Sequence, residues 1–106
     1  MNEHSIFKEV NEDIETLERH IIIIKTLLKE QPMGIIKMSQ QTGIPEHKIR
    51  YSLRILEHEE IIEASREGAI LTSNFMTNKD SILASGKKMY EGLENIYKEL
   101  KNILEN

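Results

Sequence analysis

One side of a helix predicted over residues 45–59 carries cationic, imidazole and aromatic side chains. At 100° per residue these side chains lie within about 60° of a common direction. They are His47, Arg50, Tyr51, Arg54 and His58. The acidic residues of this segment, Glu46, Glu57 and Glu59, project sideways, outside that sector. A helix face that is basic and free of acids is suited to bind an anion.

The opposite side of the same predicted helix is apolar. Ile49, Leu53 and Leu56 fall within about 60° of one another. This pattern predicts a helix that buries its aliphatic stripe in a core and shows its cations to solvent. Gly43 closes a short helical pattern before it, and Pro45 suits its first turn. This turn between two helices indicates that the anion is DNA.

A long helix is predicted over residues 5–30, because its apolar residues alternate spacings of four and three, as in a heptad seam. The seam consists of Val10, Ile14, Leu17, Ile21, Ile24 and Leu28. Four consecutive isoleucines, 21–24, leave one turn without a polar side, so we expect that turn to be enclosed from several directions. A strand over 21–24 is the competing interpretation, since isoleucine is a middling helix former. Continued heptad spacing favours the helix, which Gln31–Pro32 should end.

Shorter elements are expected in the middle of the chain. Residues 35–42 predict a short helix, or a brief strand leading into one, ended by Gly43. Residues 61–72 predict a β-hairpin with a three-residue loop, Arg66–Glu67–Gly68, in which the glycine takes left-handed backbone angles. The polar segment 74–80 can form either a loop or a helix cap.

A second heptad seam predicts another long helix over residues 80–104. It comprises Ile82, Met89, Leu93, Ile96, Leu100 and Ile103, with Tyr90, Tyr97 and Leu104 beside it. Gly86 and Gly92 weaken this helix by roughly 1 kcal/mol each, so its early part is expected to fray or bend.

Composition restricts the class of protein. A chain of 106 residues with 30% charged and 5% aromatic residues fits one mainly helical domain with an appended arm. The net charge is −4, from 14 basic and 18 acidic residues, which argues against sequence-independent coating of nucleic acid. A locally basic surface remains compatible with this balance.

Other features argue against competing classes of function. The chain has no cysteine, no apolar run long enough to span a membrane and no signal-peptide pattern, so we expect a cytoplasmic protein. It also lacks a phosphate-binding glycine loop, an H-E-x-x-H pattern and a nucleophile elbow, so we expect neither an enzyme nor a cofactor. Four scattered histidines form no recognisable metal-ligand set.

The predicted order of elements resembles the winged helix-turn-helix family of DNA-binding regulators, especially its arsenic-repressor and multiple-antibiotic-repressor branches. The resemblance covers residues 20–75. It rests on Met38–Ser–Gln–Gln–Thr–Gly43–Ile44, on Ile49-x₃-Leu53-x₂-Leu56, and on Ile61–Ile62 at the entry to the wing. Two features depart from the family: Glu60 stands where a glycine is usual, and the wing tip has a single Arg66 beside an acid.

The resemblance implies that the N-terminal part of residues 45–54 enters the major groove. Arg50 and Arg54 would then contact guanines, because the guanidinium fork matches the O6/N7 pair. Lys48 is about 100° away from the centre of the basic face and would contact a phosphate. Tyr51 would contact a phosphate or a thymine methyl group.

Four further residues complete the implied DNA-binding set. His47 belongs to the basic face, Arg66 could enter a narrowed minor groove, and Gln40 and Gln41 could contact the backbone from the preceding helix. Each has an alternative as an ordinary solvated side chain. Arg50–Glu46 and Arg54–His58 could likewise be surface pairs, each contributing a few tenths of a kcal/mol.

The expected architecture is one winged-helix domain over residues 1–106, mainly α with a small β-hairpin. Residues 20–75 form its core, and helices at 5–30 and 80–104 form a dimerisation arm. The expected dimer contacts are Val10, Ile14, Leu17, Met89, Leu93, Ile96, Tyr97, Leu100 and Ile103; alternatively, both seams pack within the subunit. The predicted function is a homodimeric, sequence-specific transcription regulator on a pseudo-palindromic double-stranded DNA operator. The alternative is a winged-helix protein–protein interaction module without an operator of its own.

Overall fold

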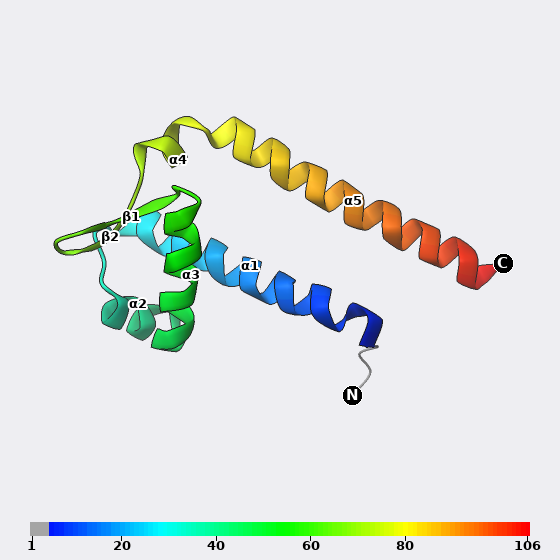
Figure 1. Ribbon diagram of the computed structural model, residues 1–106, viewed down its shortest axis with the longest axis horizontal. Coiled ribbons are helices and arrows are strands. Elements are labelled where there is room, and N and C mark those ends of the chain that lie inside the picture. The colour runs from blue at the N-terminus through cyan, green and yellow to red at the C-terminus, as the bar shows by residue number, and fades with distance from the viewer. Residues whose placement is uncertain (1–4) are drawn as a thin grey trace. The chain divides into compact units, whose positions relative to one another are not determined.

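The computed structural model describes residues 5–106, which are mainly helical with one two-stranded antiparallel hairpin (Figure 1). In chain order the elements are α1 (Ser5–Lys29), α2 (Ile35–Thr42), α3 (Glu46–His58), β1 (Ile62–Ser65), β2 (Gly68–Leu71), α4 (Ser73–Thr77) and α5 (Lys79–Glu105). They form two compact units, the first ending at Phe75 and the second covering Met76–Asn106. The mainly helical class and the hairpin are confirmed.

Helix α1 is continuous through the four isoleucines, so the strand alternative for residues 21–24 is wrong. Ile23 is fully buried and Ile24 is partly buried, whereas Ile21 and Ile22 are 55% and 42% exposed. The expected enclosure of this turn is therefore incomplete within one chain. Ile23 and Leu27 enter the core on a face about 120° away from the heptad seam, so α1 has two separate apolar faces.

The core of the first unit lies where α1, α2, α3 and the hairpin meet (Figure 1). Its buried residues are Ile23, Leu27, Met33, Met38, Ile49, Leu56, Ile62, Ala69 and Leu71. Burying one large aliphatic side chain contributes about 1.5–3 kcal/mol. This cluster fixes α3 against the other elements.

The turn between α2 and α3 follows the predicted glycine signal. Residues 35–42 form a helix rather than a strand, and Gly43 has a left-handed φ of 78°. The Gly43 N–H donates to the Ser39 carbonyl at 2.9 Å, and the Ser39 hydroxyl donates to the Ile44 carbonyl at 2.6 Å. Pro45 caps α3 with an extended ψ of 145°, one residue before its predicted place in the first turn. Its φ of −57° suits both positions, so the residue type could not separate them.

Helix α3 ends at a left-handed residue that is not glycine. Glu60 has a φ of 61°, and it is the one non-glycine residue with a positive φ in the described part of the chain. The Glu60 N–H donates to the Glu57 carbonyl at 3.0 Å, and the Ile61 N–H donates to the Leu56 carbonyl at 2.9 Å. These bonds form a Schellman motif, which explains why a glycine would suit this position.

The predicted hairpin is present, but its loop is shorter than expected. Ser65 pairs with Gly68, so Arg66–Glu67 forms a two-residue loop and the predicted three-residue loop is wrong. Gly68 has a φ of 131°, and a Cβ there would lie 2.4 Å from the Met33 carbonyl carbon. Met33 also exchanges two backbone hydrogen bonds with Ala69. A glycine is therefore required at position 68 for two reasons: a side chain would clash with the Met33 backbone, and φ is positive.

The polar segment 74–80, which could be a loop or a cap, contains the end of a short helix. Thr72 caps α4, because its hydroxyl accepts the Phe75 N–H at 3.0 Å and donates to the Glu60 carbonyl at 2.6 Å. Asn78 precedes α5 and makes no side-chain capping bond. Thr72 thus links the end of α3 to the segment that follows the hairpin.

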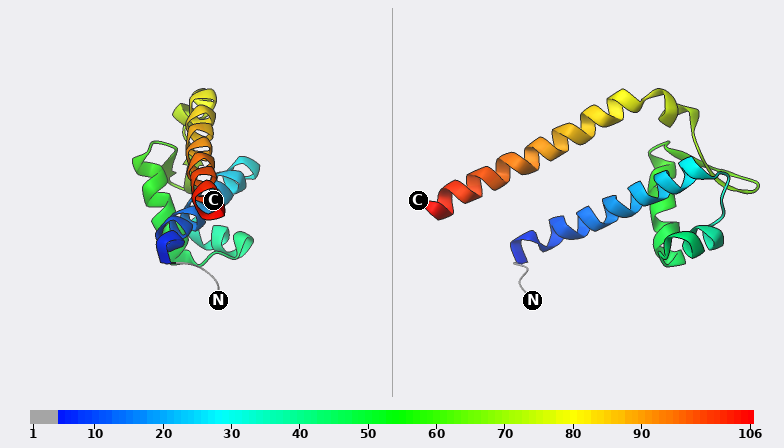
Figure 2. Two further views of the ribbon diagram at one scale, coloured as in Figure 1. Left: turned by 90° about the vertical axis from the view of Figure 1, so that its right-hand side faces the viewer. Right: turned by 180° about the vertical axis from the view of Figure 1, so that it is seen from behind.

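The second unit consists largely of α5. It is helical from Lys79 to Glu105, so Gly86 and Gly92 do not interrupt it, as Figure 2 shows. None of its residues is buried. In the part of the chain that the structure describes, no helix has both the length and the apolarity needed to cross a membrane.

Candidate nucleic-acid interface

Helix α3 separates its side chains as the sequence predicts. Ile49 and Leu56 are buried, and Leu53 is partly buried. The residues of the other side are exposed, and so is Lys48, which lies between the two sides; they are His47, Arg50, Tyr51, Arg54 and His58. Tyr51, the one tyrosine on this side, is 49% exposed. The segregated faces are confirmed: the aliphatic stripe is inside the first unit and the cations are accessible.

A basic depression of about 470 Å³ lies between α1 and α3. It is lined by Arg19, His47, Lys48, Arg50, Tyr51 and Arg54, a set that contains no acid. Among residues 5–106, no carboxylate lies within ion-pair distance of these side chains. We call this surface the basic pocket.

Arg19, which no pattern in the sequence indicated, enters the basic pocket from α1. Its Nε donates to the Ser52 hydroxyl at 2.9 Å, and one terminal nitrogen donates to the Thr16 hydroxyl at 3.4 Å. Ser52 is fully buried in the stripe formed by Ile49 and Leu56. A polar residue in that stripe is the sequence signal that a partner must come from another element.

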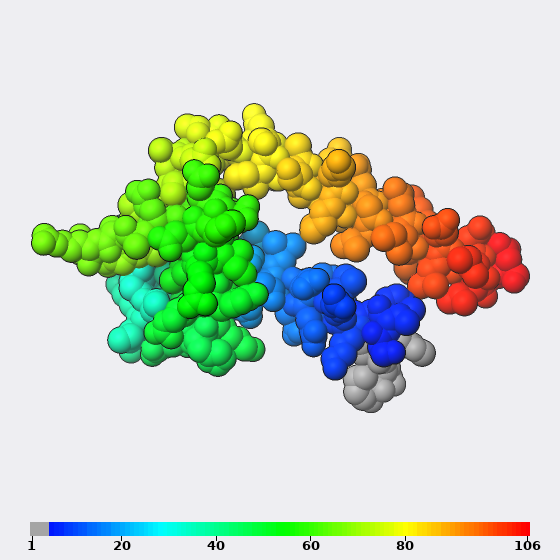
Figure 3. Space-filling model, viewed as in Figure 1, coloured from blue at the N-terminus to red at the C-terminus, as the bar shows by residue number. Residues whose placement is uncertain are grey.

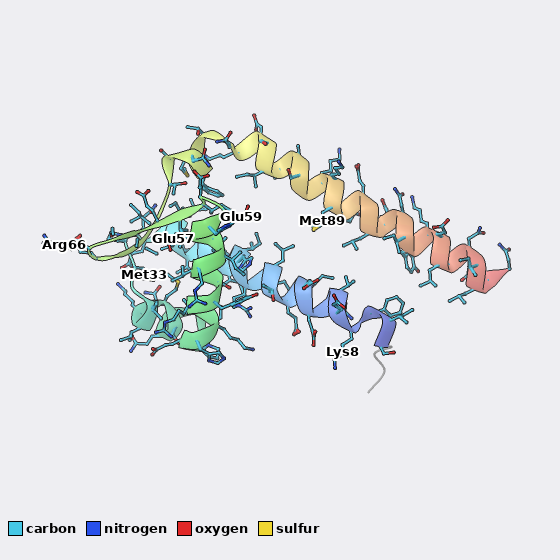
Figure 4. All side chains as sticks on the ribbon, viewed as in Figure 1. Lys8, Met33, Glu57, Glu59, Arg66 and Met89 are labelled. Carbon is cyan, nitrogen blue, oxygen red and sulfur yellow. The ribbon has the colours of Figure 1, made fainter. Side chains whose placement is uncertain are left out.

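A second concave surface, of about 590 Å³, lies between α3 and the hairpin. Arg50, Arg54 and Arg66 all line this hairpin groove, so the structure brings the predicted wing arginine together with those of α3. Glu57 and Glu67 line it too, which makes its charge mixed. Figure 4 shows Arg66 at the outer tip of the hairpin, which projects as a narrow protrusion in Figure 3.

The two glutamines of α2 are exposed but line neither concave surface. Near them, the Glu30 carboxylate is paired with Lys37. Lys37, and to a smaller extent Gln41, hold the pKa of the Glu30 carboxyl below its ordinary value. The predicted contacts of Gln40 and Gln41 with the DNA backbone gain no support from the two concave surfaces, and they stay predictions.

The alternative surface pairs on α3 do not form in the described chain. Instead of approaching Arg54, the His58 ring lies 3.4 Å from the neighbouring Glu59 carboxylate. Arg50 likewise lies beyond ion-pair distance of Glu46 in residues 5–106. Arg50 and Arg54 are consequently available to an external anion.

His20 lies next to Arg19 on α1 and is partly buried. Burial, and secondly the positive charge of Arg19, lower the pKa of His20 below its ordinary value. Its Nδ1 is buried without a hydrogen-bond partner in the described structure. Burial of the ring, more than the nearby Arg19 charge, therefore disfavours the protonated form of His20.

The predicted dimer contacts lie on exposed apolar faces. Val10, Ile14 and Leu17 of α1 are between 37% and 44% exposed. On α5 the corresponding set is Met89, Leu93, Ile96, Tyr97, Leu100 and Ile103, of which Leu100 is partly buried and the rest are exposed. Exposed apolar faces on long helices are a common feature of interaction surfaces.

The geometry suits an anion better than a metal ion. Within residues 5–106 no group of three or more histidine or acidic side chains is placed to hold a metal.

Comparison with known proteins gives no family model that matches the chain and no curated protein that resembles it. The assignment of function therefore depends on the arrangement of the residues themselves.

Proposed function

We propose that the protein is a sequence-specific, double-stranded DNA-binding transcription regulator that acts as a homodimer. The observation that carries the proposal is the exposed, acid-free cationic face of α3, backed by a buried aliphatic stripe. In this proposal α2, the turn Gly43–Ile44–Pro45 and α3 form the helix-turn-helix, and β1–β2 forms the wing. The helix order and the hairpin that follows α3 support that assignment.

Each exposed side chain of α3 has a role suited to its chemistry. Arg50 and Arg54 read guanines through bidentate hydrogen bonds, while Lys48 and His47 contact phosphates nearer the start of the helix. Tyr51 contacts a phosphate or a thymine methyl group. The net charge of −4 is compatible with this function, because the cations are concentrated on one surface.

Dimer formation follows from the exposed seams of α1 and α5. Two copies of α3 related by a two-fold axis meet successive major grooves roughly 34 Å apart on a pseudo-palindrome. A second copy also removes from water the apolar side chains that one chain leaves exposed, such as Ile96 at 65%. We propose that one two-fold assembly meets both requirements.

Titration against mixed genomic DNA fragments tests the proposal. We expect retention of specific fragments with an affinity that falls as salt is raised. Arg50→Ala and Arg54→Ala should each weaken specific binding by about 1–3 kcal/mol. Lys25→Ala, an exposed cation of α1 outside both concave surfaces, is the matched control and should change little.

A protein–protein interaction module is the second candidate. The acids Glu57 and Glu67 in the hairpin groove favour it, since they oppose a phosphate backbone on that side. This candidate predicts that no fragment is retained at low salt. It also predicts that substitutions along residues 89–103 abolish association with a different protein.

A further inference from the structure

One cationic side chain of the basic pocket comes from α1 and not from α3. Arg19 comes from α1, yet it lines the same depression as His47 and Lys48. The hairpin groove lies on the other side, and Arg50 and Arg54 line both surfaces. These two arginines therefore form a ridge with one concave surface on each flank.

Arg19 is positioned before any ligand arrives. Its Nε–H is used by Ser52 and one terminal N–H by Thr16. Three of the five guanidinium N–H groups have no protein partner among the described residues, and three is enough for a bidentate contact. Because Ser52 is buried and α1 packs on α3, little side-chain freedom remains to be lost on binding.

The lining of this flank is positively charged and contains no acid. Arg19, Lys48, Arg50 and Arg54 converge there without a carboxylate in the lining, whereas the hairpin groove contains two. A partly buried cation without a paired carboxylate favours binding of an external anion. The two sugar–phosphate backbones border the major groove, so a helix lying in that groove has a phosphate row on each flank.

We infer that the basic pocket is a phosphate subsite for one DNA strand, in which Arg19, held by Ser52, binds a backbone phosphate on the flank of α3 away from the hairpin. The inference rests on the proposed function and adds α1 to the DNA-contacting elements. Arg19 is a binding residue, and Ser52 is a positioning residue that acts through it.

Salt-dependent binding of the full-length protein to a retained duplex tests this assignment. Arg19→Gln should weaken binding about tenfold and reduce the slope of log K against log salt by about 1. The loss should be equal for specific and unrelated duplexes, because a phosphate contact carries no sequence information. Lys25→Gln, which removes the same charge from α1 outside both concave surfaces, is the matched control and should leave affinity and slope nearly unchanged.

Two further variants separate positioning from folding. Ser52→Ala keeps all charges, so it should lower affinity while leaving the salt slope unchanged. Arg19→Lys should also keep the slope, but it should bind more weakly than the wild type because it lacks the guanidinium fork. Thermal unfolding of each variant identifies any that fails to fold. Phosphate-ethylation interference on the wild-type complex then locates the contacted phosphates without any substitution in the protein.

The outcomes distinguish this inference from the proposed function. If the wild type retains no duplex, the proposed function and the subsite fail together. If the wild type binds and Arg19→Gln matches it in affinity and slope, the subsite alone is wrong. In ethylation interference, blocked phosphates on both flanks of the major groove support the subsite, and blocked phosphates on the hairpin flank alone overturn it.

Discussion

Helices α1 and α5 have the same heptad spacing, but only α1 has a second apolar face that is buried in a core. One face of α1 places Ile23 and Leu27 in the core of the first unit, while its seam is exposed except at the partly buried Ile24. Helix α5 has a seam and no buried residue at all. An isolated helix gains little stability from its backbone alone, and the proposed homodimer would cover this seam. In the proposed dimer, the apolar residues that fold the first unit are thus separate from those that join two chains.

The largest effect should come from the core face of α1. Ile23→Ala removes a fully buried side chain and should lower the free energy of unfolding by about 2–5 kcal/mol. Urea denaturation measures the change. Ile22→Ala, at a position 42% exposed and off both faces, should cost less than about 1 kcal/mol. Equal losses at the two positions would erase the distinction between core and surface on α1.

Substitution on the α5 seam should act on assembly and leave the first unit folded. Leu93→Asp should weaken self-association more than about tenfold, since it places a carboxylate in an apolar contact. Asn95→Asp, on the opposite side of α5, is the control. Sedimentation equilibrium should show monomers for Leu93→Asp and dimers for Asn95→Asp. A Leu93→Asp dimer as strong as the wild type means that the α5 seam is not the interface.

A smaller effect, confined to the first unit, is expected at Glu60. Glu60→Gly should raise the free energy of unfolding by about 0.5–1 kcal/mol, because relief of the left-handed strain exceeds the added unfolded-state entropy. Glu59→Gly, at a φ of −86°, has no such strain to relieve and should be destabilising. Chemical denaturation of both variants tests the sign. Stabilisation by Glu59→Gly instead would contradict the assigned C-cap.

The smallest effect should be a pH dependence from His20. Its folded-state pKa is lowered by burial and by Arg19, so the unfolded chain takes up a proton that the folded one resists. Stability should therefore fall as the pH drops below about 6.5, the ordinary histidine value, and level off below the folded pKa. In His20→Gln this part of the pH profile should disappear. An unchanged profile between about pH 7 and 5 would assign the titration to other groups.

Local signals in the sequence predicted the elements well, because each depends on neighbouring residues. Gly43, Pro32 and the apolar spacing of residues 49–56 mark the helix ends and the buried stripe, and the structure agrees. The core face of α1 was not predicted. The heptad seam is the stronger period there, and periodicity alone does not say which apolar face meets the rest of the chain.

The sequence predicted the candidate site residues on α3 and Arg66 on the hairpin, but not the residue contributed by α1. Arg19 joins the site through a hydrogen bond to Ser52, 33 residues away, and such a contact has no signature in local spacing. The two-residue hairpin loop was missed for a related reason. The approach of Met33 to Gly68 fixes the register there, and Met33 lies outside the hairpin sequence.

Selection of bound sequences from a random duplex pool tests the proposed function most directly, with the wild type and an Arg50→Ala/Arg54→Ala variant run side by side. We expect the wild type to enrich an inverted repeat whose half-sites are centred about 10 base pairs apart, or a multiple of that spacing. The double variant should lose the enrichment while remaining folded. A wild-type pool that stays random at low salt, or equal enrichment by the double variant, would contradict DNA reading by α3.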